Sequence, residues 1–122
     1  MEEKRDSTVF DRRALLERLD NDEELVDEIV DLYLDDATGR IGDLQEAIRA
    51  GDAVRLQRDG HSLKGASANA GAEMIREVAT QIEQAGRSGD LDRAAALVSK
   101  AGEALDVFRR VVAEAKSKTP QG

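Results

Sequence analysis

The sequence predicts an all-α protein, an antiparallel four-helix bundle of up-down-up-down topology with a short extra helix at its N-terminal end. The only proline, Pro120, lies in the last three of the 122 residues, so no proline interrupts a helix. Apolar residues recur at steps of three and four, which is the period of an amphipathic helix. The breaks between these stretches are short and contain glycine, and short connections favour antiparallel neighbours.

The first two helices follow from their capping residues and their apolar spacing. A short helix is expected from Asp11, as its N-cap, to about Leu19. Asp20-Asn21-Asp22 reads as a turn, and Asp22 can cap a long second helix that reaches about Ala50. The residues expected to face the core are Leu15, Leu16 and Leu19 in the first helix and Val26, Ile29, Tyr33, Ala37, Ile41, Leu44 and Ile48 in the second.

Three further helices are expected, from Asp52 to about Asn69, from about Ala72 to Ser88, and from Asp90 to about Lys116. In the pairs Gly51-Asp52 and Gly89-Asp90, glycine can end one helix in the left-handed conformation and aspartate can cap the next. The expected core residues are Leu56, Gly60, Leu63, Ser67 and Ala70, then Ile75, Val78, Ile82 and Ala85, then Leu91, Ala94, Val98, Ala101, Leu105, Phe108, Val112 and Ala115.

The elements predict one domain with short ends. Residues 1–10 are assigned to an N-terminal extension, residues 11–116 to the helical bundle, and residues 117–122 to a flexible C-terminal tail. A single domain of this size is ordinary, since domains usually hold on the order of 100–150 residues. Because each helical stripe is used inside one bundle, we expect a monomer.

Composition excludes several classes of function. Eighteen Lys and Arg against 26 Asp and Glu give a net charge of −8, which argues against nucleic acid and against an anionic membrane surface. The chain has no cysteine and one histidine, so thiolate sites, His-rich metal sites and two-imidazole mechanisms are excluded and no metal is expected. No signal peptide or membrane span is recognisable, so a cytoplasmic protein is expected.

The segment from Gly60 to Ala72 carries the chemistry. Because each residue of a helix turns by about 100°, His61 lies on one line with Val54 and Ala68. That line is almost opposite the inward-facing Leu63. The imidazole of the single histidine is therefore expected to point outward, among small and polar side chains.

Three neighbours of His61 fit an exposed reactive site. Gly65, one turn later, leaves space around the imidazole, and Lys64 can bring its ammonium to the same region. Gly60 lies on the inner stripe, where a missing side chain permits close helix packing. A neutral imidazole is a competent nucleophile near neutral pH, and a lysine can offset the charge of a phosphoryl group. No residue nearby is positioned to activate water, so transfer to another protein is favoured over hydrolysis.

This segment resembles the pattern of histidine phosphotransfer (HPt) domains of bacterial-type phosphorelays. The family pattern is a histidine, Leu-Lys-Gly two residues later, small residues next, and then Gly-Ala or Gly-Leu at the start of the following helix. The matching segment here is His61-Ser62-Leu63-Lys64-Gly65-Ala66-Ser67, followed by Gly71-Ala72. Three further segments fit the family pattern, so the resemblance covers nearly the whole chain. They are Gly51-Asp52, Gln81-Ile82-Glu83 and Ser88-Gly89-Asp90-Leu91. The departures are Gly60, where alanine is commoner, and Met74, where leucine is usual.

The resemblance implies the roles of the site residues. His61 would be the phosphorylated residue, exchanging the group with aspartates of receiver domains in hybrid kinases or response regulators. Lys64 would orient or neutralise the phosphoryl group, Gly65 would let the receiver approach, and Gln57 would contribute a hydrogen bond. The chain would need no cofactor, since the receiver carries the Mg²⁺ and most of the catalytic machinery. The protein would be a carrier with no ATP site and not an enzyme.

A docking surface is predicted from the antiparallel packing. The second half of the long helix should run beside the histidine helix, with residues 38–42 near the level of His61. Gly39 and Gly42 would then thin the bundle beside the site. The receiver is expected to pack on this pair of helices, around Val54, His61, Lys64, Gly65 and Ala68.

Two other functions fit a chain of this kind. A non-catalytic HPt-like adaptor would bind a signalling partner without phosphotransfer, and loss of the histidine would be its clearest mark. A phosphoacceptor module of a chemotaxis-type kinase normally belongs to a much longer chain, with an ATP-binding domain for which this sequence has no room and no phosphate loop. A fragment excised from a longer hybrid kinase stays open as an alternative to a free-standing protein.

Overall fold

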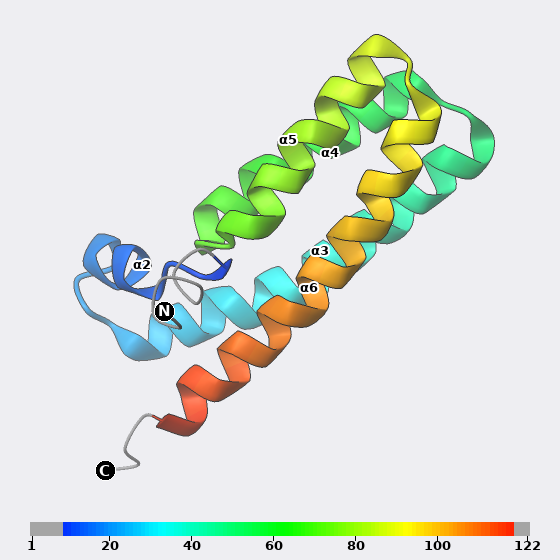
Figure 1. Cartoon of the computed structure of the whole chain (residues 1–122). Helices are drawn as coiled ribbons and strands as arrows, with labels where there is room; N and C mark the ends of the chain where they lie inside the picture. The colour runs from blue at the N-terminus through cyan, green and yellow to red at the C-terminus, as the bar shows by residue number, and fades with distance from the viewer. Residues whose placement is uncertain (1–8, 119–122) are drawn as a thin grey trace.

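The computed structural model describes residues 9–118, which form helices joined by short turns (Figure 1). The helices are α2 (Arg12–Arg18), α3 (Glu23–Ala50), α4 (Ala53–Ala70), α5 (Glu73–Ser88) and α6 (Leu91–Lys118). Each of α3 to α6 packs on its neighbour in sequence, and α6 also contacts α3, which closes the bundle. The short α2 lies at one end. The predicted all-α bundle with its short N-terminal helix is therefore confirmed.

Glycine and aspartate form the turns of the bundle as the sequence predicts. Gly51, Gly71 and Gly89 adopt the left-handed conformation, with φ of 64°, 74° and 75°. The side chain of Asp52 accepts a hydrogen bond from the backbone of α4 at 3.0 Å, and Asp90 does the same for α6 at 3.1 Å. Each of these turns needs only two residues, which keeps consecutive helices antiparallel and adjacent.

The core stripe of α4 matches its prediction, whereas that of α3 differs at two positions. All five residues expected on α4 are buried. On α3, Val30 and Ala47 are buried where the spacing predicts Ile29 and Ile48, which are half-buried. Both members of each adjacent pair are apolar, so the period alone does not choose between them. The packing of α3 between α4 and α6 decides.

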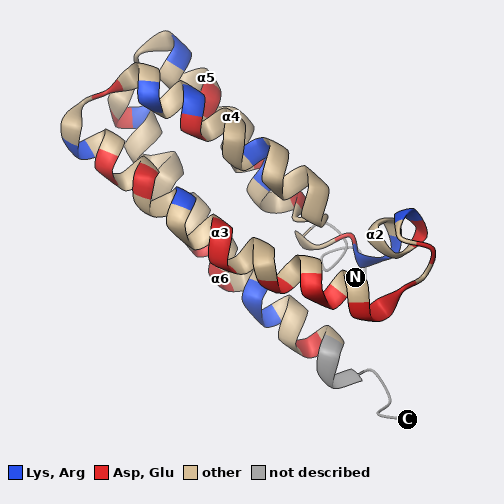
Figure 2. Cartoon of the chain, turned by 180° about the vertical axis from the view of Figure 1, so that it is seen from behind, with Lys and Arg blue, Asp and Glu red and all other residues tan. Residues whose placement is uncertain are grey.

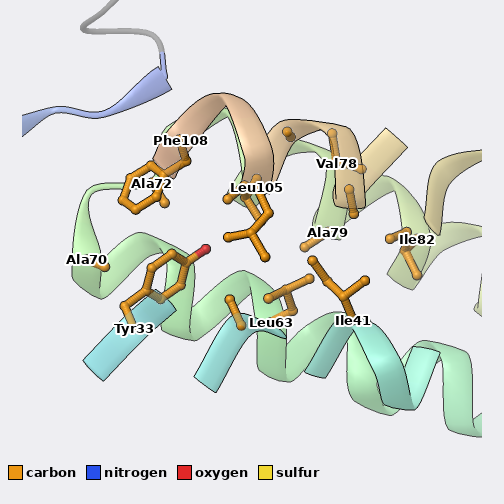
Figure 3. Packing of buried hydrophobic residues seen from close by; sticks show 14 of the residues in the cluster. Tyr33, Ile41, Leu63, Ala70, Ala72, Val78, Ala79, Ile82, Leu105 and Phe108 are labelled. Atoms are coloured by element: carbon orange, nitrogen blue, oxygen red, sulfur yellow. The ribbon is translucent and has the colours of Figure 1, made fainter. Parts of the chain in front are cut away.

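Aromatic rings fill the core near the end that carries α2. Phe108 of α6 meets Phe10 and Tyr33 edge to face, with ring centroids 5.2 and 5.4 Å apart. Figure 3 shows Tyr33 and Phe108 among aliphatic side chains of the surrounding helices, with Leu63 and Leu105 toward the centre. The Tyr33 hydroxyl lies 2.6 Å from the Ser67 hydroxyl, so a hydrogen bond joins α3 to α4 inside the core.

The chain before α2 contributes to this core. Val9 and Phe10, which the sequence analysis assigns to the N-terminal extension, are both buried. The backbone N–H of Asp11 donates to the carbonyl of Gly71 at 2.8 Å, and Arg18 of α2 donates to the carbonyl of Asn69. These bonds hold the N-terminal segment on the turn between α4 and α5. Residues 1–8 and 119–122, and with them most of the predicted tail, lie outside the described residues.

The surface is strongly acidic along one helix. α3 carries nine acidic and two basic side chains, whereas α4 and α5 together carry four acidic and five basic ones. Figure 2 shows the acidic residues spread along α3. In the part of the chain that the structure describes, no helix is both long enough and apolar enough to cross a membrane.

Candidate functional site

His61 occupies the outer face of α4, as the helical period predicts. Its side chain is 66% exposed, and Val54, two turns earlier on the same line, is 76% exposed. Gly65 and Ala68 are exposed on the same face. The structure therefore brings together four of the predicted site residues in one open strip, with the imidazole near its middle.

A carboxylate from the neighbouring helix holds the imidazole. Oε2 of Glu83, on α5, lies 3.0 Å from Nδ1 of His61. The other carboxylate oxygen, Oε1, accepts a hydrogen bond from Nζ of Lys64 at 2.8 Å. Two residues that stand three apart on α4 are thus bridged by one residue of α5.

Glu83 reaches this position because α4 and α5 lie unusually close together. A Cβ on Gly60 would come within 2.9 Å of the backbone nitrogen of Glu83, and a Cβ on Gly86 within 2.5 Å of the backbone nitrogen of Gln57. Both distances are shorter than real Cβ contacts, so the two glycines are what permits this approach. The packing role that the sequence predicts for Gly60 is confirmed.

The carboxylate is ionised at neutral pH. The hydrogen bond from Lys64 lowers the pKa of Glu83, and the hydrogen bond from His61 acts in the same direction, against the effect of burial. A carboxylate can only accept hydrogen bonds, so Nδ1 of His61 must carry the proton in this contact. The lone pair of a neutral ring then lies on Nε2, on the opposite edge of the imidazole.

A second cation stands beside the same carboxylate. Nη2 of Arg87, one turn after Glu83 on α5, lies 3.6 Å from Oε2. This distance is within ion-pair range but too long for a hydrogen bond. The side chain of Arg87 is 64% exposed, whereas Glu83 is only 8% exposed.

Two other predicted site residues, Gln57 and Gly42, lie on the neighbouring helices α4 and α3. Gln57 stands one turn before His61, half-buried, and its backbone packs against Gly86 of α5. No hydrogen bond between Gln57 and His61 is formed among the described residues. Gly42 lies on α3, and a Cβ there would meet no atom within 4 Å, so this glycine is not needed for helix packing.

Glu83 and Arg87 are the site residues that sequence reasoning missed. Glu83 belongs to the segment Gln81-Ile82-Glu83, which fits the family pattern, but the sequence analysis assigns no role in the site to Glu83. One signal was available: Glu83 is a charged residue four positions after Ala79 and three before Gly86, on a row of small residues that favours close helix contact. The identity of its partner on α4 requires the register between the helices.

Within residues 9–118, no group of three or more His, Asp and Glu side chains is arranged to hold a metal ion.

Comparisons with known proteins identify the family of this chain. The family model described as the Hpt domain matches residues 28–116. Multistep phosphorelay regulator 1 of Schizosaccharomyces pombe is 43% identical over 82 residues, which are 66% of this chain and 27% of that protein. The chain therefore spans about a quarter of the length of this relative.

Solved structures show the same fold. The histidine-containing phosphotransfer protein B of Pseudomonas aeruginosa PAO1 superposes with a TM-score of 0.81 at 28% identity, over 92% of this chain and 97% of that one. The HPT domain of a sensor hybrid histidine kinase from Shewanella gives 0.68 at 18% identity, over 88% and 97%, a likeness of fold. Since the family model matches well over half of the sequence, the chain belongs to the Hpt domain family.

Proposed function

We propose that this chain carries a phosphoryl group on Nε2 of His61, accepting it from an aspartate of one receiver domain and passing it to another in a multistep phosphorelay. The observation that carries the proposal is the hydrogen bond from Nδ1 of His61 to Glu83. This bond fixes the tautomer in which the nucleophilic nitrogen is the one turned away from the bundle. Membership of the Hpt domain family supports the same role.

The transfer balances without moving a proton. The Nε2 lone pair attacks the phosphorus of an aspartyl phosphate, and the bond from phosphorus to the aspartate oxygen breaks as the N–P bond forms. The aspartate leaves as a carboxylate. The ring keeps its proton on Nδ1 and becomes positively charged, and the negative charge of Glu83 stabilises it. In the second transfer an aspartate of the next receiver attacks the phosphorus, and the neutral imidazole is regenerated.

Lys64 supports the phosphoryl group in this proposal. A phosphoryl group adds roughly −1.5 to −2 charge at pH 7, and an ammonium at the same edge of the helix offsets part of it. The side chain of Lys64 is 33% exposed, so its ammonium has room to turn from Glu83 toward the outer edge of the imidazole. Gln57 is assigned a hydrogen bond to the phosphoryl group or the receiver, because it stands one turn away on the same side.

The proposal assigns the Mg²⁺ to the receiver domain and no cofactor to this chain. Its residues provide a nucleophile, a carboxylate and a cation, which suffice to hold a phosphoryl group but not to activate ATP. The chain acts as a carrier, and the cytoplasm is its expected location.

The receiver is proposed to lie across the outer face of α4 and the adjoining part of α3. Val54 is an exposed apolar residue on the histidine line, and Leu32 on α3 is exposed as well. Leu32 borders a hollow of about 280 Å³ between α3 and α4, which Ala66 and Asn69 also line. Gly65 adds no side chain next to the imidazole, and Gly42 of α3 is assigned to the same face from the antiparallel packing of α3 and α4.

Phosphotransfer from a receiver domain charged with acetyl phosphate and Mg²⁺ tests the proposal. We expect the intact mass of the wild type to rise by one phosphoryl group that is labile in acid. His61→Gln should fold, since the side chain is exposed, and should stay unmodified. If several receivers of the same cell leave the wild type unmodified, the carrier role is wrong and the adaptor role takes its place.

The docking face has its own test. A glutamine at Gly65 would project beside the imidazole, so Gly65→Gln should slow transfer about tenfold, which corresponds to about 1.4 kcal/mol. Gly102→Gln on α6 is the matched control, since a Cβ there also meets no atom within 4 Å. Transfer by Gly65→Gln at the wild-type rate would contradict the assigned face.

A further inference from the structure

Once His61 is phosphorylated, the ammonium of Lys64 has two possible partners, the carboxylate of Glu83 and the phosphoryl group. In the structure its ammonium donates to Oε1 of Glu83 at 2.8 Å. In the proposed function the same ammonium must turn toward the phosphoryl oxygens on Nε2. The ammonium has three N–H donors, and each one that turns to the phosphoryl oxygens weakens the hold of Lys64 on Glu83.

Glu83 cannot lose Lys64 without a replacement. Only 11% of the Glu83 side chain is exposed, so water can replace the lost hydrogen bond only in part. A carboxylate that is nearly buried and loses a charged hydrogen bond is destabilised. The Nδ1 proton of His61 would still bond to Oε2, but Oε1 would be left without a donor.

Arg87 is the cation placed to compensate the carboxylate for this loss. It follows Glu83 by one helical turn, and its guanidinium already lies 3.6 Å from Oε2, so a small movement would give that oxygen a second hydrogen bond and keep a positive charge beside the carboxylate. Gly86 faces Gln57 and Gly60 faces Glu83, so Arg87 lies toward the N-terminal end of α4, on the other side of the carboxylate from Lys64. An arginine carries five N–H donors, and this one is exposed enough to move.

We propose that Arg87 is a positioning residue that takes over the carboxylate of Glu83 when Lys64 turns to the phosphoryl group, an inference that rests on the proposed function. Glu83 then stays compensated and keeps its hold on Nδ1 of the phosphorylated ring. The exchange lets one lysine serve the unphosphorylated and the phosphorylated site in turn.

A double-mutant cycle on the transfer equilibrium tests this exchange. The wild type, Arg87→Gln, Lys64→Gln and the double variant are each equilibrated with one phosphorylated receiver, and the phosphorylated fraction is read by intact mass. Arg87→Gln should lower the equilibrium constant about fivefold when Lys64 is present, as expected for one partly exposed ion pair. In the Lys64→Gln background the same change should have less than about a twofold effect, because no lysine leaves Glu83 there.

Three controls separate this role from a purely structural one. Arg87→Lys keeps a cation at this position, so its equilibrium constant should recover at least half of the decrease seen in Arg87→Gln. Arg76→Gln removes an arginine of the same helix that bonds to Glu73 at 2.6 Å and should have no effect on transfer. Unphosphorylated Arg87→Gln should match the wild type in far-UV circular dichroism and in its urea midpoint.

The outcomes are distinct. An unchanged equilibrium in Arg87→Gln overturns the inference, and so does an equal loss in both Lys64 backgrounds, which would mean that Arg87 contacts the phosphoryl group or the receiver directly. A wild type that no receiver phosphorylates refutes the proposed function itself.

Discussion

Within one imidazole, the nitrogen that carries the proton decides what the residue can do. Glu83 decides it here, because an ionised carboxylate accepts the proton of Nδ1 and leaves the lone pair on Nε2. The exposure of His61 alone would allow either tautomer. In the proposed phosphotransfer, the reactivity of this exposed histidine would therefore depend on a nearly buried residue of the neighbouring helix.

The lowered pKa of Glu83 predicts a pH-dependent contribution to stability. The pKa of Glu83 is lower in the folded state than its ordinary value of 4.5, so its ionised carboxylate stabilises the fold above pH 4.5. This stabilisation is lost as the pH falls through the pKa of the folded state. Glu83→Gln should therefore cost about 1–2 kcal/mol at pH 7, from weakened charged hydrogen bonds, and less at pH 3.5. Urea unfolding of both proteins at the two pH values measures the difference.

The matched control for this experiment is Glu77→Gln, an exposed position on the same helix. Its effect on the free energy of unfolding should be within about 0.5 kcal/mol at both pH values. An equal cost of Glu83→Gln at pH 7 and pH 3.5 would show that the charge of Glu83 does not contribute.

The Tyr33–Ser67 pair gives a second residue-level prediction. Burial raises the pKa of Tyr33 to about 12, so its hydroxyl stays protonated and can share a hydrogen bond with Ser67 across the core. Tyr33→Phe should lower the free energy of unfolding by about 1 kcal/mol, because the Ser67 hydroxyl loses this partner. In a double-mutant cycle with Ser67→Ala, measured by urea unfolding, additive effects would contradict the pairing.

Among the elements, the pair α4 and α5 matters most for the site. Their separation sets whether the carboxylate of Glu83 reaches His61 and Lys64 at once. Gly60 and Gly86 allow the short separation, since a Cβ at either position would meet backbone atoms of the facing helix at less than 3.0 Å. Backbone cannot move aside as a flexible side chain can, so the glycines are required by packing.

Alanine substitutions should separate the packing glycines from the exposed ones. Gly86→Ala should lower the free energy of unfolding by about 1–3 kcal/mol through overpacking, despite the higher helix propensity of alanine. Gly102→Ala, where a Cβ meets open space, should raise it by about 0.5–1 kcal/mol. Thermal or urea unfolding gives both values. A stabilised Gly86→Ala would mean that α4 and α5 are not in close contact.

Across the whole molecule, the apolar residues are used inside the bundle and the charges are divided between its sides. Among the described residues, the large hydrophobic side chains that are exposed are Leu25, Leu32 and Val54. The acidic excess lies on α3, whereas the pair α4 and α5 is nearly balanced, so the phosphoryl group would be placed on the less acidic side (Figure 2).

This distribution predicts a monomer in solution. Three separated apolar residues do not form the large continuous patch that a stable dimer needs, and the net charge of −8 opposes self-association. Light scattering after size exclusion should give the mass of one chain, 13.3 kDa, at micromolar concentration and physiological salt. A mass near twice that value, independent of dilution, would contradict it.

Local rules were enough to predict the helices and the face on which the histidine lies. Caps, left-handed glycines and the turn of about 100° per residue act within a few positions, so the bounds of α3 to α5 and the outward direction of His61 follow from the sequence. The choice between Ile29 and Val30, or between Ala47 and Ile48, does not, because both members of each pair are apolar.

Only the tertiary structure decided which groups surround the imidazole. Glu83 stands 22 positions after His61, and their contact depends on the register and separation of α4 and α5, which no local period specifies. The burial of Phe10 has the same origin, since its ring packs against Phe108 from the far end of the chain. The sequence determined the exposed face on which the single histidine lies, and packing between distant segments determined its tautomer and the charges around it.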